Sequence, residues 1–149
     1  MRETCTLGSV GAKSNDCATR PSPTNWLGDA TVLSLTGGGA CGWGTRPGDS
    51  RTGVLWAVTY TDESVSLDED MANWPTDDLQ YSGTLRGRGF TATYKTSGDY
   101  LAWVCQFREA SISGTFSDDF TSFEAQESLI WGPPENETRV ERRWHVSRP

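Results

Sequence analysis

Two charged residues stand out because each lies on the apolar face of a predicted strand. In the segment 121–131, Glu127 alternates with aromatic and aliphatic side chains, and in 138–146 Arg142 does the same. The two segments are predicted to be hairpin neighbours. A buried charge without a partner is prohibitively costly, so if both side chains point inward they should pair. The pair is either a polar anchor at the end of an aromatic-lined pocket or a structural ion pair near the rim of the fold.

Aromatic residues supply the rest of the predicted pocket. Alternation assigns four tryptophans to apolar faces, and Phe107 shares a face with one of them, Trp103. Such residues serve either as ordinary core or as a ligand platform. The ligand-binding residues predicted from the sequence are Trp56, Trp103, Phe107, Glu127, Trp131, Arg142 and Trp144.

The sequence contains no catalytic or metal-binding motif. The stretch 68–78 holds five Asp or Glu residues that could offer oxygen ligands to Ca²⁺, but their spacing differs from that of an EF-hand loop. A solvated acidic surface is the alternative. His145 is the single histidine, and no Gly-x-Ser-x-Gly motif accompanies it. We therefore predict no catalytic residue, no metal site and no cofactor.

The elements that position these side chains are short strands. No segment shows helical periodicity, and Gly-, Pro- and Asp-containing turns separate runs of β-forming residues. The predicted strands cover residues 30–35, 53–60, 64–67, 81–85, 90–94, 100–107, 111–116, 121–131 and 138–146. Mostly short connections indicate an all-β, antiparallel up-and-down barrel of about eight strands, with a β-sandwich as the alternative. Residues 1–25 are interpreted as a flexible tail and 26–149 as a single domain.

Length and charge exclude several classes of protein. The chain has 149 residues, enough for one domain with a real core. A formal net charge of −7 argues against a protein that holds nucleic acid by its phosphates. No apolar run approaches the roughly 20 residues of a membrane-spanning helix. We therefore expect neither a nucleic-acid partner nor a transmembrane segment.

The cysteines suggest an oxidising compartment. The chain has four of them and no Cys-x-x-Cys or Cys/His pair typical of zinc. Of the three pairings, we favour Cys5–Cys17 together with Cys41–Cys105; four free thiols in a cytosolic protein are the alternative. No signal peptide is visible. We expect an exported protein, secreted, periplasmic or on the cell surface, whose signal has been removed.

In layout, residues 26–149 resemble the small calycin-type β-barrels, which include lipocalins, avidins and bacterial lipoproteins with lipocalin-like barrels. The resemblance is carried by Asn25-Trp-Leu-Gly28, which opens the first strand, and by the Ser-Gly-Thr-Phe sequence at 113–116. Lipocalins place a glycine before the opening tryptophan, whereas Gly28 follows Trp26. The resemblance implies a barrel whose mouth or lumen holds a small apolar molecule, and it assigns no binding residue.

The sequence thus predicts a non-catalytic binding protein for a small apolar or aromatic molecule. One alternative is a small enzyme with its active site in the barrel pocket, using Glu127, Arg142 or residues of the acidic stretch. Another is a structural or adhesive module of the cell surface.

Overall fold

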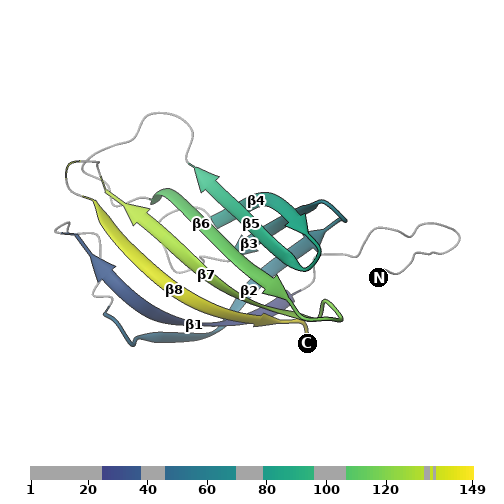
Figure 1. Ribbon diagram of the computed structural model, residues 1–149. Coiled ribbons are helices and arrows are strands. Elements are labelled where there is room, and N and C mark those ends of the chain that lie inside the picture. Colours follow the sequence, from purple (N-terminus) through teal and green to yellow (C-terminus); the bar gives the residue numbers. More distant parts are fainter. Residues whose placement is uncertain (1–24, 38–45, 70–78, 96–106, 133–134, 136) are drawn as a thin grey trace, which may run out of the picture.

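The computed structural model describes residues 25–37, 46–69, 79–95, 107–132, 135 and 137–149. In this part of the chain, eight strands form one closed antiparallel barrel (Figure 1). The strands are β1 (Asn25–Thr36), β2 (Ser50–Tyr60), β3 (Ser64–Glu69), β4 (Leu79–Arg86), β5 (Gly89–Lys95), β6 (Phe107–Phe116), β7 (Ser122–Trp131) and β8 (Thr138–Ser147).

The barrel has simple up-and-down connectivity. Each strand pairs with the next in the chain, and β1 pairs with β8 to close the sheet. Closure leaves no exposed sheet edge. The predicted barrel is therefore confirmed, and the sandwich alternative is wrong. The coarse layout implied by the calycin-type resemblance is also confirmed.

The alternation of side chains explains why these segments form a barrel wall. In β8, every second residue from Thr138 to Val146 is buried, and the residues between them are exposed or partly exposed. In β2, Val54, Trp56 and Val58 alternate with less buried residues in the same way. Inward residues of all eight strands thus meet in one core.

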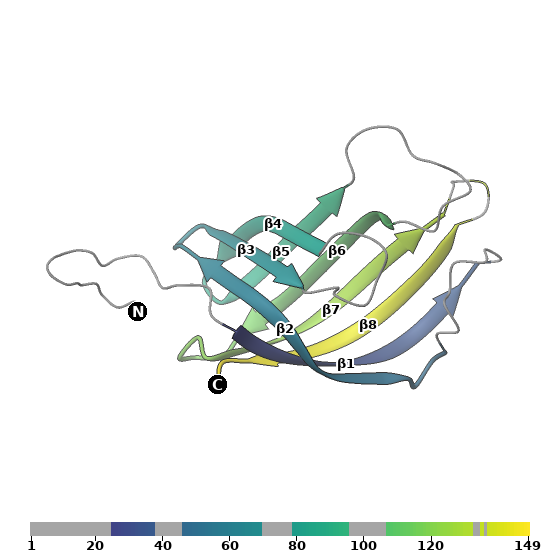
Figure 2. The same cartoon turned by 180° about the vertical axis from the view of Figure 1, so that it is seen from behind.

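The two ends of the barrel differ in the connections that leave them. The odd-numbered strands all point toward one end (Figure 2). At that end the chain connects Thr36 to Ser50, Glu69 to Leu79, Lys95 to Phe107 and Trp131 to Thr138. At the opposite end the connections span Tyr60 to Ser64, Arg86 to Gly89 and Phe116 to Ser122. We call these the long-connection end and the short-turn end.

Aromatic rings fill the barrel at the short-turn end. Phe116 stacks on Phe120 with ring centroids 4.9 Å apart, and Tyr60 lies 5.0 Å from Phe120. Trp26 packs edge-on against Phe116 at 6.3 Å. Outside these rings, the Arg148 guanidinium lies 5.7 Å from the Trp26 ring centroid. This end of the interior is consequently packed with side chains.

Several predicted strand boundaries are wrong. A strand was predicted over residues 64–67, but β3 continues through Asp68 and Glu69 because both pair with β4. The segments 100–107 and 111–116 were predicted as separate strands. Instead, β6 runs without interruption over Phe107–Phe116 and accommodates an irregularity opposite Trp131 and Ile130. β1 and β2 are also longer than predicted.

Several predictions concern residues outside the described part of the chain. The residues outside the described ranges include Trp103, nearly all of the predicted 100–107 strand and the tail up to residue 24. They also include the four cysteines, and with them both proposed disulfides. Within the described residues, no helix has the length and hydropathy needed to span a membrane.

Candidate functional site

The predicted pair of Glu127 and Arg142 is present in the barrel interior. The two residues are directly opposite each other in the β7–β8 register. Glu127 is fully buried and Arg142 is 5% exposed. Nε of Arg142 donates a hydrogen bond to Glu127 Oε1 at 2.8 Å, and Nη2 lies 2.6 Å from the same oxygen. The expectation that two inward charges on neighbouring strands should pair is therefore confirmed.

Two further residues complete the hydrogen bonding of Glu127. Trp144 Nε1 donates to Oε1 at 2.7 Å, and the Tyr81 hydroxyl donates to Oε2. Trp144 lies two residues after Arg142 on the inward face of β8, and its ring centroid is 4.9 Å from the Arg142 guanidinium carbon. Four N–H or O–H donors thus satisfy a carboxylate that burial would otherwise destabilise.

Glu69 brings a second carboxyl group to the same guanidinium. It is the last residue of β3 and is 1% exposed. Nη2 of Arg142 lies 3.2 Å from Glu69 Oε1 and 3.0 Å from Oε2. Glu69 and Glu127 are also hydrogen-bonded to each other. We refer to Glu69, Tyr81, Glu127, Arg142 and Trp144 as the buried polar cluster.

One carboxyl group of the cluster carries the negative charge. Burial disfavours ionisation of Glu127, but Arg142 and the hydrogen bonds from Glu69, Tyr81 and Trp144 outweigh it and lower its pKa. Burial and the neighbouring Glu127 raise the pKa of Glu69 well above its ordinary value, against the opposing effect of Arg142. These opposite pKa shifts favour the negative charge on Glu127, which has more donors, and the proton on Glu69.

The other titratable groups of the cluster keep their protons. Burial and the two carboxyl groups raise the pKa of Tyr81 well above its ordinary value. Burial opposes the charge on Arg142, yet Glu127 and Glu69 together raise its pKa. With Glu69 neutral, the cluster has one positive and one negative charge.

The cluster reaches toward the long-connection end. Glu69 is the last residue of β3, and Thr138 is the first residue of β8 at the same end of the barrel. Thr138 pairs in register with Trp131, the last residue of β7, and both are buried. Among the described residues, the Thr138 hydroxyl has no hydrogen-bond partner.

The predicted ligand-binding residues divide into three groups. Trp56 and Trp144 pack edge to face with centroids 4.9 Å apart and lie beside the charged pair. Trp131 lies on the inward face at the long-connection end. Phe107 begins β6, where its backbone pairs with Trp131, but its side chain lies outside the description, as does Trp103. The structure thus brings together four of the seven: Trp56, Glu127, Arg142 and Trp144.

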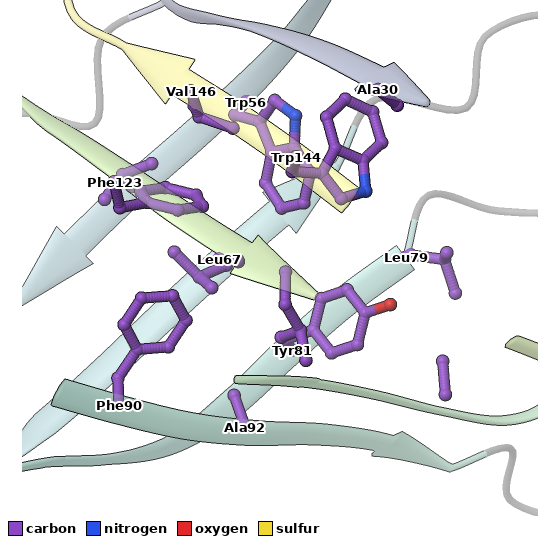
Figure 3. Packing of buried hydrophobic residues seen from close by; sticks show 14 of the residues in the cluster. Ala30, Trp56, Leu67, Leu79, Tyr81, Phe90, Ala92, Phe123, Trp144 and Val146 are labelled. Atoms are coloured by element: carbon purple, nitrogen blue, oxygen red, sulfur yellow. The ribbon is translucent and has the colours of Figure 1, made fainter. Parts of the chain in front are cut away.

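Figure 3 shows how the polar atoms are directed. The Tyr81 hydroxyl and the Trp144 ring nitrogen lie toward the side of Leu79, away from the rings of Phe90 and Phe123. Leu79 is the first residue of β4 and therefore lies at the long-connection end. The polar atoms of the cluster consequently face the end opposite the aromatic packing.

Two members of the cluster, Glu69 and Tyr81, were absent from the predicted site. Glu69 continues the alternation of Val65 and Leu67 and is buried like them, a signal that the surrounding acidic residues obscured. Tyr81 alternates with Leu79 in the same manner. Extending the predicted strand by two residues, one further period of the alternation, would have placed Glu69 on the inward face.

A separate hollow lies on the outer surface. It has a volume of about 780 Å³ and lies over strands β4 to β8, where exposed hydroxyl side chains such as Thr91 and Ser113 line it together with Arg143. None of the five predicted ligand residues whose side chains are described lines it. His145 and Glu124 form an exposed pair on this same outer face of β7 and β8. In the described ranges, no three His, Cys, Asp or Glu side chains are arranged to hold a metal ion.

No known protein family matches this sequence, and no curated protein matches it either.

Proposed function

We propose that this protein is a non-catalytic binding protein of lipocalin-like type, which takes a small molecule with an apolar or aromatic body at the long-connection end of the barrel. The observation that carries the proposal is the buried polar cluster. Desolvating a guanidinium and a carboxylate is costly, and apolar residues of similar volume often stabilise a core as well or better. A polar anchor for a ligand explains the cluster, whereas fold stability alone does not.

The surroundings of the cluster support this proposal. Ligand sites are mostly apolar and contain a few placed polar groups that orient the bound molecule. The inward side chains between the cluster and the long-connection end fit this description, since they combine Leu79, Leu129 and Val140 with the hydroxyl of Thr138 and the indole of Trp131. The short-turn end is packed with aromatic rings and is the less suitable end for a ligand.

An enzymatic role for the cluster has less support. A general acid or base must exchange a proton with its substrate. The Glu127 carboxylate accepts hydrogen bonds from Arg142, Trp144 and Tyr81, and it is fully buried. Its lone pairs are thus already occupied. A binding surface on the outer hollow is the second candidate, favoured by its size and by its exposed hydroxyl groups.

Export is part of the same proposal and rests on the cysteines. Four cysteines without a zinc-type spacing fit a protein that matures in an oxidising compartment. Peptide mapping without reduction should find Cys105 in a disulfide. A free thiol at Cys105 in the protein isolated from its natural source would remove this support.

Binding can be tested with N-phenyl-1-naphthylamine, a neutral aromatic probe, titrated into the full chain. We expect saturable probe fluorescence with one site per chain and quenching of tryptophan emission. Thr138→Phe fills the long-connection end and should abolish binding. Thr115→Phe, at an exposed position on the outside of β6, is the matched control and should bind as the native chain does.

Each outcome of this experiment decides something. No saturable binding by the folded native chain would overturn the proposal. Loss of binding in Thr115→Phe but not in Thr138→Phe would place the site on the outer hollow, which Thr115 lines. Thermal unfolding of both variants tests whether they fold. If Thr138→Phe does not fold, Thr138→Val serves as the conservative substitution at the same position.

A further inference from the structure

The buried polar cluster contains more carboxyl groups than cations. It contains two carboxyl groups, from Glu69 and Glu127, but a single guanidinium, that of Arg142. Both carboxyl groups contact the same nitrogen, Nη2. Two carboxylates so close together cannot both remain ionised beside one cation without a further compensating charge. Burial beside Glu127 raises the pKa of Glu69, which favours a proton on Glu69 as that compensation in the free protein.

We infer that the ligand is an organic cation, a primary amine on an apolar or aromatic body, and that its ammonium group binds beside Glu69. This inference rests on the proposed function and specifies the ligand class of the same site.

Glu69 is the member of the cluster suited to receive a ligand. Glu127 accepts hydrogen bonds from Arg142, Trp144, Tyr81 and Glu69, whereas among the described residues Glu69 is hydrogen-bonded to Arg142 and Glu127 only. Glu69 also ends β3, so it is closest in the sheet to the long-connection end. We therefore place the ammonium beside Glu69 and not beside the Glu127–Arg142 pair.

Two further groups lie at the same end of the barrel, beyond Leu129 and Val140 as seen from the cluster. The buried hydroxyl of Thr138 has no hydrogen-bond partner among the described residues, and it offers an acceptor oxygen. The indole of Trp131 is buried opposite Thr138 in the β7–β8 register. Thr138 lies four residues before Arg142 in β8, so these two groups face the body of a ligand whose ammonium, with three donors and no acceptor, binds the carboxyl oxygens of Glu69.

The charges around Glu69 disfavour an anionic ligand. Among the described residues, the titratable groups that face Glu69 are Arg142 from β8, Glu127 from β7 and Tyr81 from β4, while the neighbouring Trp56 of β2 is uncharged. The inward side chains described for β5 carry no charge either. Because Glu127 already neutralises Arg142, an incoming anion would add an uncompensated negative charge, whereas a cation restores neutrality once Glu69 ionises.

Binding of the ammonium is coupled to release of one proton. The free protein holds Arg142 as a cation, Glu127 as an anion and Glu69 as a neutral acid. When the ammonium binds, the Glu69 O–H bond breaks, the proton passes to solvent, and two cations then face two carboxylates. The net charge of the cluster is zero before and after binding. The affinity for an amine should accordingly rise with pH until Glu69 is ionised in the free protein.

Three naphthalene probes of matched body test the inference: 1-naphthylmethylamine, 1-naphthylmethanol and 1-naphthoic acid. Titration calorimetry on the full chain at neutral pH should show the amine binding roughly ten- to a hundred-fold more tightly than the alcohol, as expected for a charge-assisted hydrogen bond in a buried site. Repeating the amine titration in phosphate and in Tris should show release of up to one proton.

Glu69→Gln should remove both the preference for the amine and the proton release, while the alcohol still binds. Glu124→Gln, an exposed glutamate on the outside of β7, is the control and should change neither. Equal affinities for the amine and the alcohol, tighter binding of the acid, or an unchanged preference in Glu69→Gln would overturn the inference and leave the proposed function standing. Failure of all three probes to bind would count against the proposed function itself.

Discussion

Arg142 of β8 donates from one nitrogen, Nη2, to both carboxyl oxygens of Glu69 in β3, although the two residues lie 73 positions apart in the sequence. The contact crosses the barrel interior, because β3 and β8 are not neighbours in the sheet. Arg142 also binds Glu127 on the adjacent strand. A single guanidinium thereby joins opposite walls of the barrel, and the stability of the cluster depends on all three residues.

The pairing of Glu127 and Arg142 can be measured by a double-mutant cycle. Glu127→Gln or Arg142→Met alone should lower the free energy of unfolding by about 3–5 kcal/mol, because each leaves a buried group without its partner. The double variant should cost less than the sum of the two. Urea unfolding gives all three values. Arg143→Met, on the outer face, should change stability by less than about 0.5 kcal/mol. Strictly additive effects would show that the pair is not coupled.

The Tyr81 hydroxyl should contribute measurably to stability. Tyr81→Phe removes its hydrogen bond to the charged Glu127 while preserving the ring, and should cost about 1.5–3 kcal/mol. Tyr60→Phe, at the short-turn end, is the matched control, since Tyr60 lies outside the buried polar cluster and packs by its ring against Phe116 and Phe120. Comparable losses in the two variants would mean that the Glu127 contact adds nothing specific.

Glu69 should make stability fall as the pH rises. Its pKa is raised above the ordinary value of 4.5 in the folded protein, so between these two values the folded state binds more protons than the unfolded state. The contribution of Glu69 is therefore fully present below about pH 4.5 and is lost as the pH rises through its folded pKa. Glu127, whose pKa is lowered, acts in the opposite sense below 4.5.

Unfolding free energies of the native chain and Glu69→Gln, measured from pH 4 to pH 9, check this dependence. The free energy of unfolding of Glu69→Gln should rise relative to that of the native chain as the pH increases. Glu124→Gln serves again as the exposed control. Parallel pH profiles for the native chain and Glu69→Gln would contradict the raised pKa.

Two glycines are required by the close approach of neighbouring strands. A Cβ added to Gly83 would lie 1.9 Å from the Thr91 carbonyl oxygen, and one added to Gly114 would lie 2.3 Å from the Glu124 oxygen. Gly83→Ala should therefore destabilise the barrel by about 1–3 kcal/mol or more, as overpacking does. Gly89→Ala is the control because its nearest contact would be an ordinary 3.7 Å. Thermal unfolding midpoints of the two variants and the native chain test this prediction. An unchanged midpoint for Gly83→Ala would show that the strands can move apart without loss of stability.

The amino-acid sequence by itself determined the local features of this protein. Period-two alternation is a property of each strand, so it identified the barrel wall and the inward positions of Trp56, Trp131 and Trp144. It also paired Glu127 with Arg142, because hairpin neighbours lie opposite each other in a register that the turn and the apolar faces define. These contacts link residues that are close in the chain.

The remaining contacts of the buried polar cluster depend on closure of the sheet. Glu69 and Tyr81 reach Glu127 and Arg142 only because the barrel curves until β3 and β4 face β7 and β8, and no pattern along one strand records a contact across a lumen. The charge state of Glu69 has the same origin, since it arises from burial beside a second carboxyl group. The sequence thus specified which side chains point inward, and only the tertiary structure determined which of them meet.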